Sequence, residues 1–343
     1  MRAITQQRPG GPEELVLAEV ATPEPGAGEV RIAVAAAGVN RADLLQRRGF
    51  YPPPAGISDI LGLEVAGVVD AIGPVDKPKH GGNPWSADYA RTQQEPPVPK
   101  VGAQVVALLA GGGYAEFAVV PAGQCAPVPS GVSLVEAGAI METAATVVSN
   151  FDHIGVAAGE TILIHGGAGG IGSFAIPYAK HLGLTVITTI GDAAKAAHVH
   201  AVGADVVLDY HDDWAQGVRE ATAGRGVDAI LDIIGAKYLE ANLSALARGG
   251  RMVVIGLQGG TKATLDLNRL LTKAATITAT SLRFRPLADK ARIVRQVVER
   301  VWPLFESGEI PLPPIRTFPL AEAGAAHEYL DSGVSVGKVV LTV

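Results

Sequence analysis

Cysteine is almost absent from this chain: among 343 residues there is one, Cys125. A single cysteine excludes an intrachain disulfide and agrees with a reducing compartment, and we interpret it as a small buried hydrophobe. Hydrophobic residues make up 48% of the chain, yet no eighteen of them follow one another, so we expect no membrane span. The first residues, "MRAITQQRPGG", lack the apolar core of a signal peptide. Together these absences predict a cytoplasmic protein.

An excess of basic charge is missing as well. The net charge is −6, and acidic and basic residues are interspersed along the chain. Nucleic acid selects a basic stripe on a protein surface, and this sequence offers none. We therefore expect no nucleic-acid partner.

Glycine, by contrast, crowds the middle of the chain. The short apolar run Thr161 to His165 predicts a buried strand, and Gly170 to Leu182 has helical spacing. Between them, Gly167, Gly169 and Gly172 match G-x-G-x-x-G, in which glycines permit a tight turn, a close pyrophosphate and a packed helix. The pyrophosphate of a dinucleotide would lie at the positive end of that helix.

Alternating strands and helices continue after this motif. A second strand, Thr185 to Ile190, ends before Asp192, an acidic residue placed to bind ribose hydroxyls. Further strands are expected at Val206 to Leu208, Val227 to Asp232 and Arg251 to Ile255, and helices at Trp214 to Thr222 and Ala236 to Ala247. The alternation predicts an α/β fold, a Rossmann-type doubly wound parallel sheet with helices on both faces.

The first 125 residues have a different texture. Short β-rich runs, broken by glycine and proline, are found at Glu29 to Ala35, Glu64 to Ala71, Gln104 to Leu109 and Ala115 to Val120. They predict an irregular β domain. Residues 74–100 predict a long polar loop, either a solvated insertion or a lid or subunit contact. Leu287 to Ser307 predicts one amphipathic helix, and residues 336–343 a closing strand.

Five sequence words now resemble the zinc-free, zeta-crystallin-like NAD(P)H:quinone oxidoreductases of the medium-chain dehydrogenase/reductase superfamily. They are "AAGVNRADLLQRRGFYPPP" (36–54), "LGLEVAGVVDAIG" (61–73), "GGGYAEFAVVP" (111–121), "HGGAGGIG" (165–172) and "VGKVVLTV" (336–343). The resemblance implies a GroES-like catalytic and substrate domain over 1–125, a Rossmann dinucleotide-binding domain over 126–275, and a segment 276–343 that packs back on the first. It also implies an active site in the cleft between domains and a homodimer.

Zinc enzymes of the same superfamily carry a catalytic cysteine near Asn40 and a histidine at the position of Leu63. Leucine offers no lone pair to a metal, and one cysteine cannot make a four-cysteine site. The sequence therefore predicts a protein without metal. Glu64 is then interpreted as a structural carboxylate bonded to backbone or to arginine.

By resemblance, Asn40 and Tyr51 are the candidate catalytic residues, because both offer hydrogen bonds to an oxygen that gains charge. The alternatives are a turn residue for Asn40 and a packing aromatic for Tyr51. The residues expected to bind the cofactor are Asn40, Thr146, Gly167, Ala168, Gly169, Gly170, Ile171, Gly172, Gly191, Asp192, Lys195, Tyr210, Ile255, Gly256, Leu257, Ser281, Leu282 and Arg283. Thr146 could instead be an ordinary helix hydroxyl, and the stretches around Gly256 and Leu282 could serve only core and turns. Asp232 has two possible roles: it lies near the cofactor at the sheet edge that carries these stretches, or it only caps the segment that follows it.

The cofactor preference depends on "TIGDAAK" at 189–195. Asp192 stands where NADPH-specific relatives usually have serine, and its carboxylate accepts hydrogen bonds from NADH but repels a 2′-phosphate. Lys195 and Tyr210 occupy positions at which the family contacts that phosphate, although Lys195 could instead form a surface ion pair with Asp192. We predict use of both cofactors, with NADPH ahead of NADH.

Three functions compete at this point. The first is hydride or electron transfer from NAD(P)H to a quinone, and the second is reduction of the carbon–carbon double bond of an enone or enal, since both need the same geometry. The third is a dinucleotide-binding protein with a structural or regulatory role, because a fold alone does not establish catalysis.

Overall fold

The computed structural model describes residues 1–74 and 98–343, so most of the predicted loop 74–100 lies outside the described residues. The chain forms two compact units. The first contains Met1–Ala145, Arg283–Glu306 and Ile315–Val343, and the second contains Thr146–Leu282 and Ser307–Pro314. Helix α4 (Met141–Ile154) continues from the first into the second.

A six-stranded parallel sheet forms the centre of the second unit. Its strands are β8 (Thr161–His165), β9 (Thr185–Ile190), β10 (Val206–Asp209), β11 (Val227–Asp232), β12 (Leu246–Val254) and β13 (Thr276–Ala279). They lie in the order β10-β9-β8-β11-β12-β13, so the chain order reverses between β8 and β11. In doubly wound folds the ligand lies outside the carboxyl ends of the strands at this reversal. The predicted Rossmann-type sheet is confirmed.

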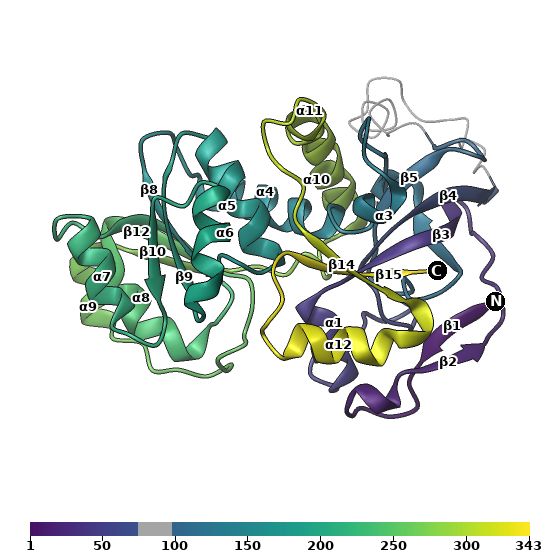
Figure 1. Cartoon of the computed structure of the whole chain (residues 1–343), viewed down its shortest axis with the longest axis horizontal. Helices are drawn as coiled ribbons and strands as arrows, with labels where there is room; N and C mark the ends of the chain where they lie inside the picture. Colours follow the sequence, from purple (N-terminus) through teal and green to yellow (C-terminus); the bar gives the residue numbers. More distant parts are fainter. Residues whose placement is uncertain (75–97) are drawn as a thin grey trace, which may run out of the picture. The chain divides into compact units, whose positions relative to one another are not determined.

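Helices cover both faces of this sheet (Figure 1). They are α5 (Gly170–His181), α6 (Ala196–Ala201), α7 (Trp214–Ala221), α8 (Leu239–Ala245) and α9 (Leu267–Lys273). In Figure 1, α5 and α6 lie on one side of the strands and α7 to α9 lie on the other. The helix α5 follows β8 directly, which places its first turn at the carboxyl end of that strand.

The first unit contains a mixed seven-stranded sheet. Its strands are β3 (Glu29–Val39), β4 (Glu64–Ile72), β5 (Gln104–Leu108), β6 (Phe117–Pro121), β7 (Cys125–Pro127), β14 (Ile315–Pro319) and β15 (Lys338–Thr342). The order is β14-β15-β3-β4-β5-β7, with β6 on β3, and β14 and β15 are the parallel pair. This is the separate β domain that the sequence predicts, closed by a strand from the end of the chain.

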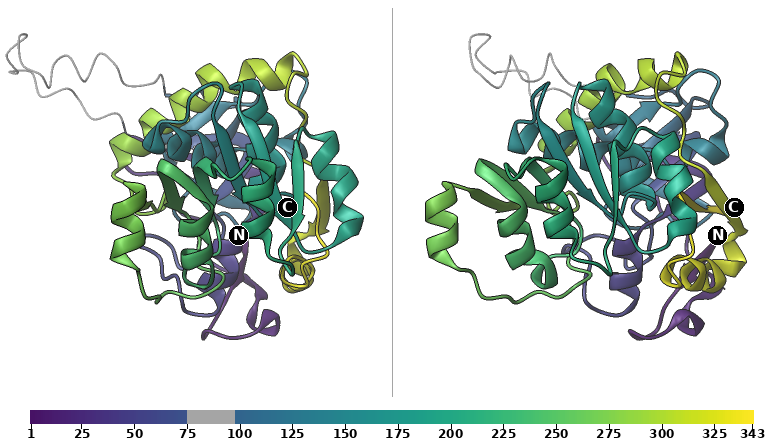
Figure 2. Two further views of the ribbon diagram at one scale, coloured as in Figure 1. Left: turned by 90° about the vertical axis from the view of Figure 1, so that its left-hand side faces the viewer. Right: turned by 60° about the vertical axis from the view of Figure 1, so that its left-hand side comes forward.

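Further elements surround that sheet. They are the hairpin β1 (Arg2–Thr5) and β2 (Val16–Glu19), and the helices α1 (Arg41–Arg47), α3 (Leu134–Ala137), α10 (Leu287–Arg300), α11 (Trp302–Glu306) and α12 (Ala323–Asp331). Short 3-10 helices occur at Pro12–Glu14, Ala122–Gln124, Ala193–Lys195, Ala236–Tyr238 and Leu320–Glu322. The N-terminal hairpin, purple in Figure 2, lies beside the yellow helix α12, and a Cβ on Gly324 would lie 2.9 Å from the carbonyl oxygen of Pro12.

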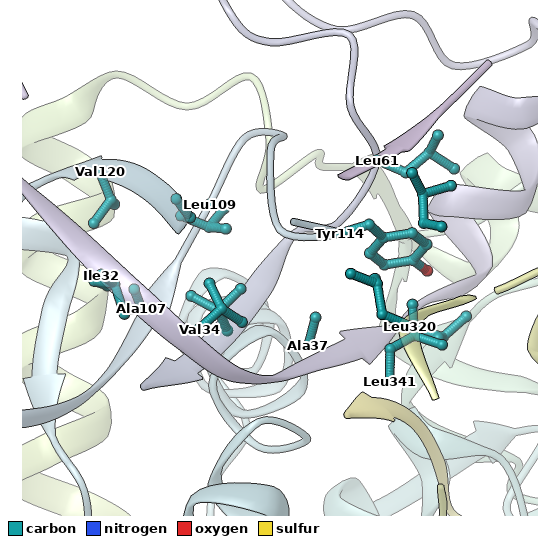
Figure 3. Packing of buried hydrophobic residues seen from close by; sticks show 14 of the residues in the cluster. Ile32, Val34, Ala37, Leu61, Ala107, Leu109, Tyr114, Val120, Leu320 and Leu341 are labelled. Carbon is teal, nitrogen blue, oxygen red and sulfur yellow. The ribbon is translucent and has the colours of Figure 1, made fainter. Parts of the chain in front are cut away.

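Apolar side chains from these strands pack into one core in the first unit (Figure 3). Ile32, Val34 and Leu341 come from neighbouring strands, and Tyr114 joins them with its ring fully buried. Because the ring is apolar and its hydroxyl is not, the hydroxyl needs a partner at the edge of this core.

Several sequence expectations about element ends are wrong, and the strand predicted at Arg251 to Ile255 is β12, which begins at Leu246. The predicted helix Leu287 to Ser307 is two helices, because Pro303 has no N–H for the carbonyl of Glu299 and α10 ends at Arg300. The predicted helix Ala236 to Ala247 ends at Ala245, since Leu246 has extended backbone with ψ of 141° and begins β12. Within the described residues, no helix is long and apolar enough to cross a membrane.

Candidate active site

The glycine loop lies between β8 and α5, and each of its three motif glycines has its own spatial reason. A Cβ on Gly167 would lie 2.2 Å from Thr188 Oγ1, and one on Gly172 would lie 2.3 Å from the carbonyl oxygen of Gly167. Both positions are therefore closed to side chains, Gly167 by strand β9 and Gly172 by the loop itself. A Cβ on Gly169 would meet nothing nearer than 3.5 Å, the carbonyl oxygen of Gly166. Its side is open, so an outside group can come close to the backbone there.

The start of α5 adds hydrogen-bond donors to this open side. Gly169 is the N-cap residue, and glycine has no side chain with which to cap the helix. The N–H groups of Gly170, Ile171 and Gly172 have no partner within the helix, because the first turn of any α-helix leaves them without one. Ala168 is buried with 5% of its surface exposed, and Ile171 is partly exposed. This end of α5 is suited to an anion such as pyrophosphate.

The next two strands bring Gly191, Asp192 and Tyr210 together. A Cβ on Gly191 would lie 2.0 Å from the phenolic oxygen of Tyr210, so the ring lies directly on the glycine backbone. Tyr210 is 45% exposed, and its backbone N–H donates to the carbonyl oxygen of Ile190 at 2.9 Å. Asp192 is exposed and caps a 3-10 turn by accepting from the N–H of Ala194 at 2.9 Å. Lys195 is the last residue of that turn.

On the other side of the strand reversal, Asp232 holds the segment that follows β11. Its carboxylate accepts from the N–H groups of Ile234 at 2.6 Å and Gly235 at 3.1 Å, which is the capping role left open by the sequence. Burial raises the pKa of Asp232 to about 6. Its carbonyl accepts from the N–H of Ile255 at 2.8 Å.

The residues after β12 pack closely on that segment. A Cβ on Gly256 would lie 2.6 Å from the carbonyl oxygen of Ile233, so this position also has no room for a side chain. Leu257 is 48% exposed. The structure therefore brings the stretch Ile255 to Leu257 against the end of β11 and leaves Leu257 open to a ligand.

Thr146 lies near the end of β13, joined to it by one asparagine. The carbonyl of Thr146 accepts from Asn150 Nδ2 at 2.7 Å, and Asn150 Oδ1 accepts from Thr280 Oγ1 at 2.6 Å. Ser281 and Leu282 follow directly and are partly exposed. Thr146 and this stretch, predicted from distant parts of the sequence, are thus neighbours within the second unit.

In the first unit, Asn40 belongs to a buried charged cluster. Its Nδ2 donates to Glu64 Oε1 at 3.0 Å, and its Oδ1 accepts from Lys338 Nζ at 2.5 Å. Lys338 Nζ also donates to Glu64 Oε1 at 2.7 Å. Asn40 is 8% exposed, Lys338 3% and Glu64 0%. The amide of Asn40 is held on both sides, and one of its two N–H donors is given to Glu64.

The partner of Glu64 differs from the expectation. Its Oε2 accepts from the backbone N–H of Glu142 at 2.9 Å, as expected for a structural carboxylate, but its charged partner among the described residues is Lys338, a lysine instead of an arginine. A Cβ on Gly38 would lie 2.3 Å from Glu64 Oε1, so glycine in the word "AAGVN" makes room for the carboxylate.

Asp43 fixes the start of α1, three residues after the N-cap Asn40. Its carboxylate accepts from the N–H of Asn40 at 2.7 Å, from the N–H of Gly62 at 3.1 Å and from the Tyr114 hydroxyl at 3.2 Å. Burial raises the pKa of Asp43 to about 6 despite these donors. Tyr114 Oη also lies 3.1 Å from His327 Nε2, and burial lowers the pKa of His327 to about 3.

Tyr51 is held by Arg283. The Arg283 guanidinium lies over the Tyr51 ring at 5.2 Å, and its Nη1 donates to the Tyr51 carbonyl at 3.0 Å. Its Nε donates to the carbonyl of Ala110 at 2.6 Å, and Arg283 is 4% exposed. Phe284 meets the Tyr51 ring edge-on at 5.5 Å. Arg283 thus lies against Tyr51, a candidate catalytic residue of the same unit. Arg283 and Phe284 both hold Tyr51 in place, in addition to its neighbouring prolines.

With this geometry described, two family models match the chain. The Alcohol dehydrogenase GroES-like domain matches residues 26–130, and the Zinc-binding dehydrogenase model matches residues 170–300. A quinone oxidoreductase of Pseudomonas aeruginosa is 31% identical, over 97% of this chain and 96% of its own length. The chain belongs to the medium-chain dehydrogenase/reductase superfamily.

Two further members of the superfamily are similar over their whole length. A 2-haloacrylate reductase of a Burkholderia species is 29% identical, over 99% of this chain and 98% of its own. The structure of an Escherichia coli quinone oxidoreductase complexed with NADPH covers 100% of both chains, with 28% identity and a TM-score of 0.86. Relatives of this chain therefore include reductases named for two kinds of acceptor.

Several residues of this superfamily member escaped the sequence reasoning. Lys338 lies within the quoted word "VGKVVLTV". A lysine among the apolar residues of a strand indicates a buried ammonium that needs an acidic partner. Asp43 follows Asn40 by three residues, the spacing of a capping box. His165 ends an apolar strand directly before the glycine loop and attracted no role.

The name of the second family model raises the question of zinc. Among residues 1–74 and 98–343, no three His, Cys, Asp or Glu side chains are grouped as a metal site. A positive observation bears on the same point, because the Lys338 ammonium lies against Glu64 and Asn40, the residues near which zinc relatives hold metal. That a metal plays no part stays a prediction.

Proposed function

We propose that this protein is an NAD(P)H-dependent reductase that delivers hydride or electrons to a quinone without a metal. The observation that carries the proposal is the open side of Gly169 at the uncapped start of α5, placed at the strand reversal of a doubly wound sheet. Similar proteins named quinone oxidoreductase, one of them complexed with NADPH, support the choice of cofactor and acceptor.

The residues of the second unit suit the parts of a dinucleotide. The N–H groups of Gly170 and Ile171 would hold the pyrophosphate, and Asp192 would accept hydrogen bonds from ribose hydroxyls, with Lys195 and Tyr210 near a 2′-phosphate. Leu257 and Thr146 would border the nicotinamide half. When bound, the cofactor supplies the hydride itself.

The residues of the first unit would act on the acceptor. Asn40 has one amide N–H beyond the one given to Glu64, and Tyr51 has a phenolic O–H on a ring held by Arg283. Donors placed in advance around an oxygen that gains charge lower the barrier, because no reorientation is needed during the reaction. We assign Asn40 and Tyr51 to this task, with Arg283 holding Tyr51.

The direct test is oxidation of NADPH and NADH against a panel of quinones and enones, followed by the loss of nicotinamide absorbance. We expect turnover with quinones. The similarity to a 2-haloacrylate reductase gives one competing acceptor class, an activated carbon–carbon double bond. Turnover with enones alone would make that class the function, and no turnover with any acceptor would leave a binding protein.

We also propose a homodimer formed through β13 and α9. Strand β13 is an edge of its sheet, where unpaired backbone groups can pair with a second copy. On α9 no residue is buried, and Leu267 and Leu271 are 68% and 76% exposed on one side of the helix. Scattered apolar residues are ordinary, but two leucines four apart beside an open edge favour a partner of the same chain.

Sedimentation of a variant with Leu267→Glu and Leu271→Glu tests this surface. We expect a dimer for the wild type and a monomer for the variant. Leu287→Glu is the matched control, since Leu287 is 58% exposed at the start of a helix in the other unit. A dimer that survives the double substitution would place the interface elsewhere.

A cytoplasmic location is proposed from the single cysteine, and cell fractionation checks it.

A further inference from the structure

Four buried side chains form a continuous hydrogen-bonded chain under the glycine loop. Thr189 Oγ1 lies 3.0 Å from His165 Nδ1, and His165 Nε2 lies 2.8 Å from Asn242 Oδ1. Asn242 Nδ2 lies 3.2 Å from Asp232 Oδ2. Thr189 is 1% exposed and the other three are 0% exposed. The four come from the ends of β9, β8 and β11 and from α8.

The direction of every hydrogen bond in this chain follows from its acidic end. An ionised Asp232 only accepts, so Asn242 turns its NH₂ toward it and its oxygen toward His165. His165 must then donate from Nε2, which leaves a lone pair on Nδ1. That lone pair accepts from the hydroxyl of Thr189, whose oxygen is in turn 3.3 Å from the N–H of Gly166. One tautomer of a neutral His165 satisfies the whole chain.

Aromatic rings hold the His165 imidazole in this orientation. The Trp214 ring meets it at 4.8 Å and the Tyr238 ring at 4.9 Å, with interplanar angles of 78° and 64°. Edge-to-face contacts of this kind fix the plane of a ring. Burial also keeps the imidazole neutral. Nothing in the proposed reaction uses this histidine.

Each end of the chain holds a loop that we assign to the cofactor. Thr189 accepts the N–H of Gly166 on its hydroxyl at 3.3 Å and the N–H of Gly167 on its carbonyl at 3.0 Å, which fixes the start of the glycine loop. Asp232 accepts the N–H groups of Ile234 and Gly235, and this segment packs on Gly256. His165 lies in the middle, between the pyrophosphate side and the nicotinamide side.

We propose that His165 is a positioning residue that sets the glycine loop relative to the loops after β11 and β12. The proposal rests on the proposed function, because it needs these loops to hold one dinucleotide. A buried hydrogen-bonded group with a single allowed arrangement acts as a fixed spacer, whereas an apolar side chain would leave both loop ends free to shift. His165 would then control dinucleotide affinity without touching the dinucleotide.

The first test needs no variant. Nitrogen NMR of the wild-type protein distinguishes the two neutral tautomers and the imidazolium of His165. We expect the Nε2–H tautomer at neutral pH, where Asp232 is ionised, with and without NADPH. The Nδ1–H tautomer, or an imidazolium at neutral pH, would overturn the proposal.

The second test compares a full dinucleotide with a fragment of it. Thr189→Val keeps the shape of the side chain but removes the link from His165 to Gly166. We expect the Kd for NADPH to rise by about tenfold, as for loss of one buried hydrogen bond, and the Kd for adenosine 2′-monophosphate to stay unchanged. Thr189→Ser should restore NADPH affinity, because it keeps the hydroxyl.

Thr161→Val is the matched control. Thr161 is a 7% exposed threonine at the opposite end of β8, where its hydroxyl accepts from Arg225 Nη2 at 3.1 Å. It should leave both Kd values unchanged. If Thr189→Val changes neither Kd, or weakens the fragment as much as NADPH, the positioning role is wrong. If the wild type itself fails to bind NADPH, the proposed function has failed and not this inference.

Discussion

Both units bury a polar network beside residues that we assign to the reaction, but the networks differ in charge. The first unit buries an ammonium and a carboxylate, Lys338 and Glu64, around the amide of Asn40. The second unit uses a neutral imidazole and an amide, with one carboxylate, Asp232, at the end of the chain. The first network holds Asn40 by charge-assisted hydrogen bonds from an ammonium and to a carboxylate, whereas the second holds its loops mainly by hydrogen bonds between neutral groups.

This difference matches the two tasks. The acceptor side needs donors near an oxygen that becomes negative, so a cation close to Asn40 is useful there. The cofactor side needs two loops at a fixed separation, for which direction matters more than charge. Five predictions test this contrast.

Lys338→Met should have the largest effect. It leaves the Glu64 carboxylate buried without its cation, and breaking a buried pair in this way costs about 3–5 kcal/mol in free energy of unfolding. Denaturant unfolding checks the value. Adding Glu64→Gln should recover much of the stability, because no charge then remains buried alone. If the double variant is no more stable than Lys338→Met, the pair contributes by packing rather than by charge.

Tyr51→Phe should separate the units by function. Removing one hydrogen-bond donor to the transition state lowers kcat for quinones by roughly ten- to a hundredfold, while the Kd for NADPH stays nearly the same. Steady-state kinetics and calorimetry give the two numbers. Tyr329→Phe in α12, a tyrosine of the same unit packed on Phe318, is the control and should change neither. Equal kinetics for Tyr51→Phe and wild type would make Tyr51 a packing residue.

Each buried histidine should contribute stability that acid removes, opposite in sign to the contribution of Asp43 and Asp232, whose pKa values burial raises to about 6. Burial lowers the pKa of His165 to about 4 and of His327 to about 3, so both are neutral in the folded protein while the unfolded chain takes up their protons near pH 6.5. The contribution of each histidine to the free energy of unfolding is complete above pH 6.5 and is lost as the pH falls. Between pH 7 and pH 5 the loss is about 2 kcal/mol for each histidine.

The check compares wild type with His327→Gln at the two pH values. Glutamine cannot take up the proton, so the stability difference between wild type and variant should shrink by about 2 kcal/mol at pH 5. A difference that is the same at both pH values would mean that His327 is not buried neutral. His165→Gln should behave alike in the second unit.

Asp192→Ser should act only on the cofactor. Removing a carboxylate near a 2′-phosphate raises the ratio of kcat/KM for NADPH over NADH by about fivefold, or about 1 kcal/mol. Asp212→Ser is the control, because Asp212 is also an exposed aspartate. Glu160→Gln would not serve as a control, because Glu160 forms an ion pair with Arg251. An unchanged ratio in Asp192→Ser would show that Asp192 does not face the ribose.

A chelator should have no effect at all. We expect elemental analysis to find no stoichiometric zinc and activity to persist in chelator, because Leu63 offers no ligand and Lys338 already places a cation beside Glu64. One tightly held zinc per chain, lost together with activity, would contradict this.

The sequence was informative where signals are local. The strand Thr161–His165 and the strand Thr185–Ile190 were predicted with their observed ends, because short apolar runs between glycines mark buried parallel strands. The glycine loop follows from the G-x-G-x-x-G spacing together with the apolar strand before it and the helical spacing after it. The break at Pro303 is also a local signal, because proline lacks the N–H that a continuous helix needs there.

Contacts between distant residues could not be predicted in this way. Lys338 reaches Glu64 across 274 positions of sequence, and His165 reaches Asn242 across 77. Each partner has an ordinary local environment in the sequence, and only the strand order brings the pairs together. Similarly, that Tyr210 lies on Gly191 depends on the register of β10 against β9.

The lone sulfhydryl has a consequence for the enzyme's survival. Quinones and enones are electrophiles that alkylate thiolates, and a reductase meets them at every turnover. Cys125 is 8% exposed, and burial raises its pKa to about 12, so almost no thiolate exists at neutral pH. With no other cysteine in the chain, the protein presents its own acceptors with no reactive sulfur, and repeated turnover should not inactivate it by this route.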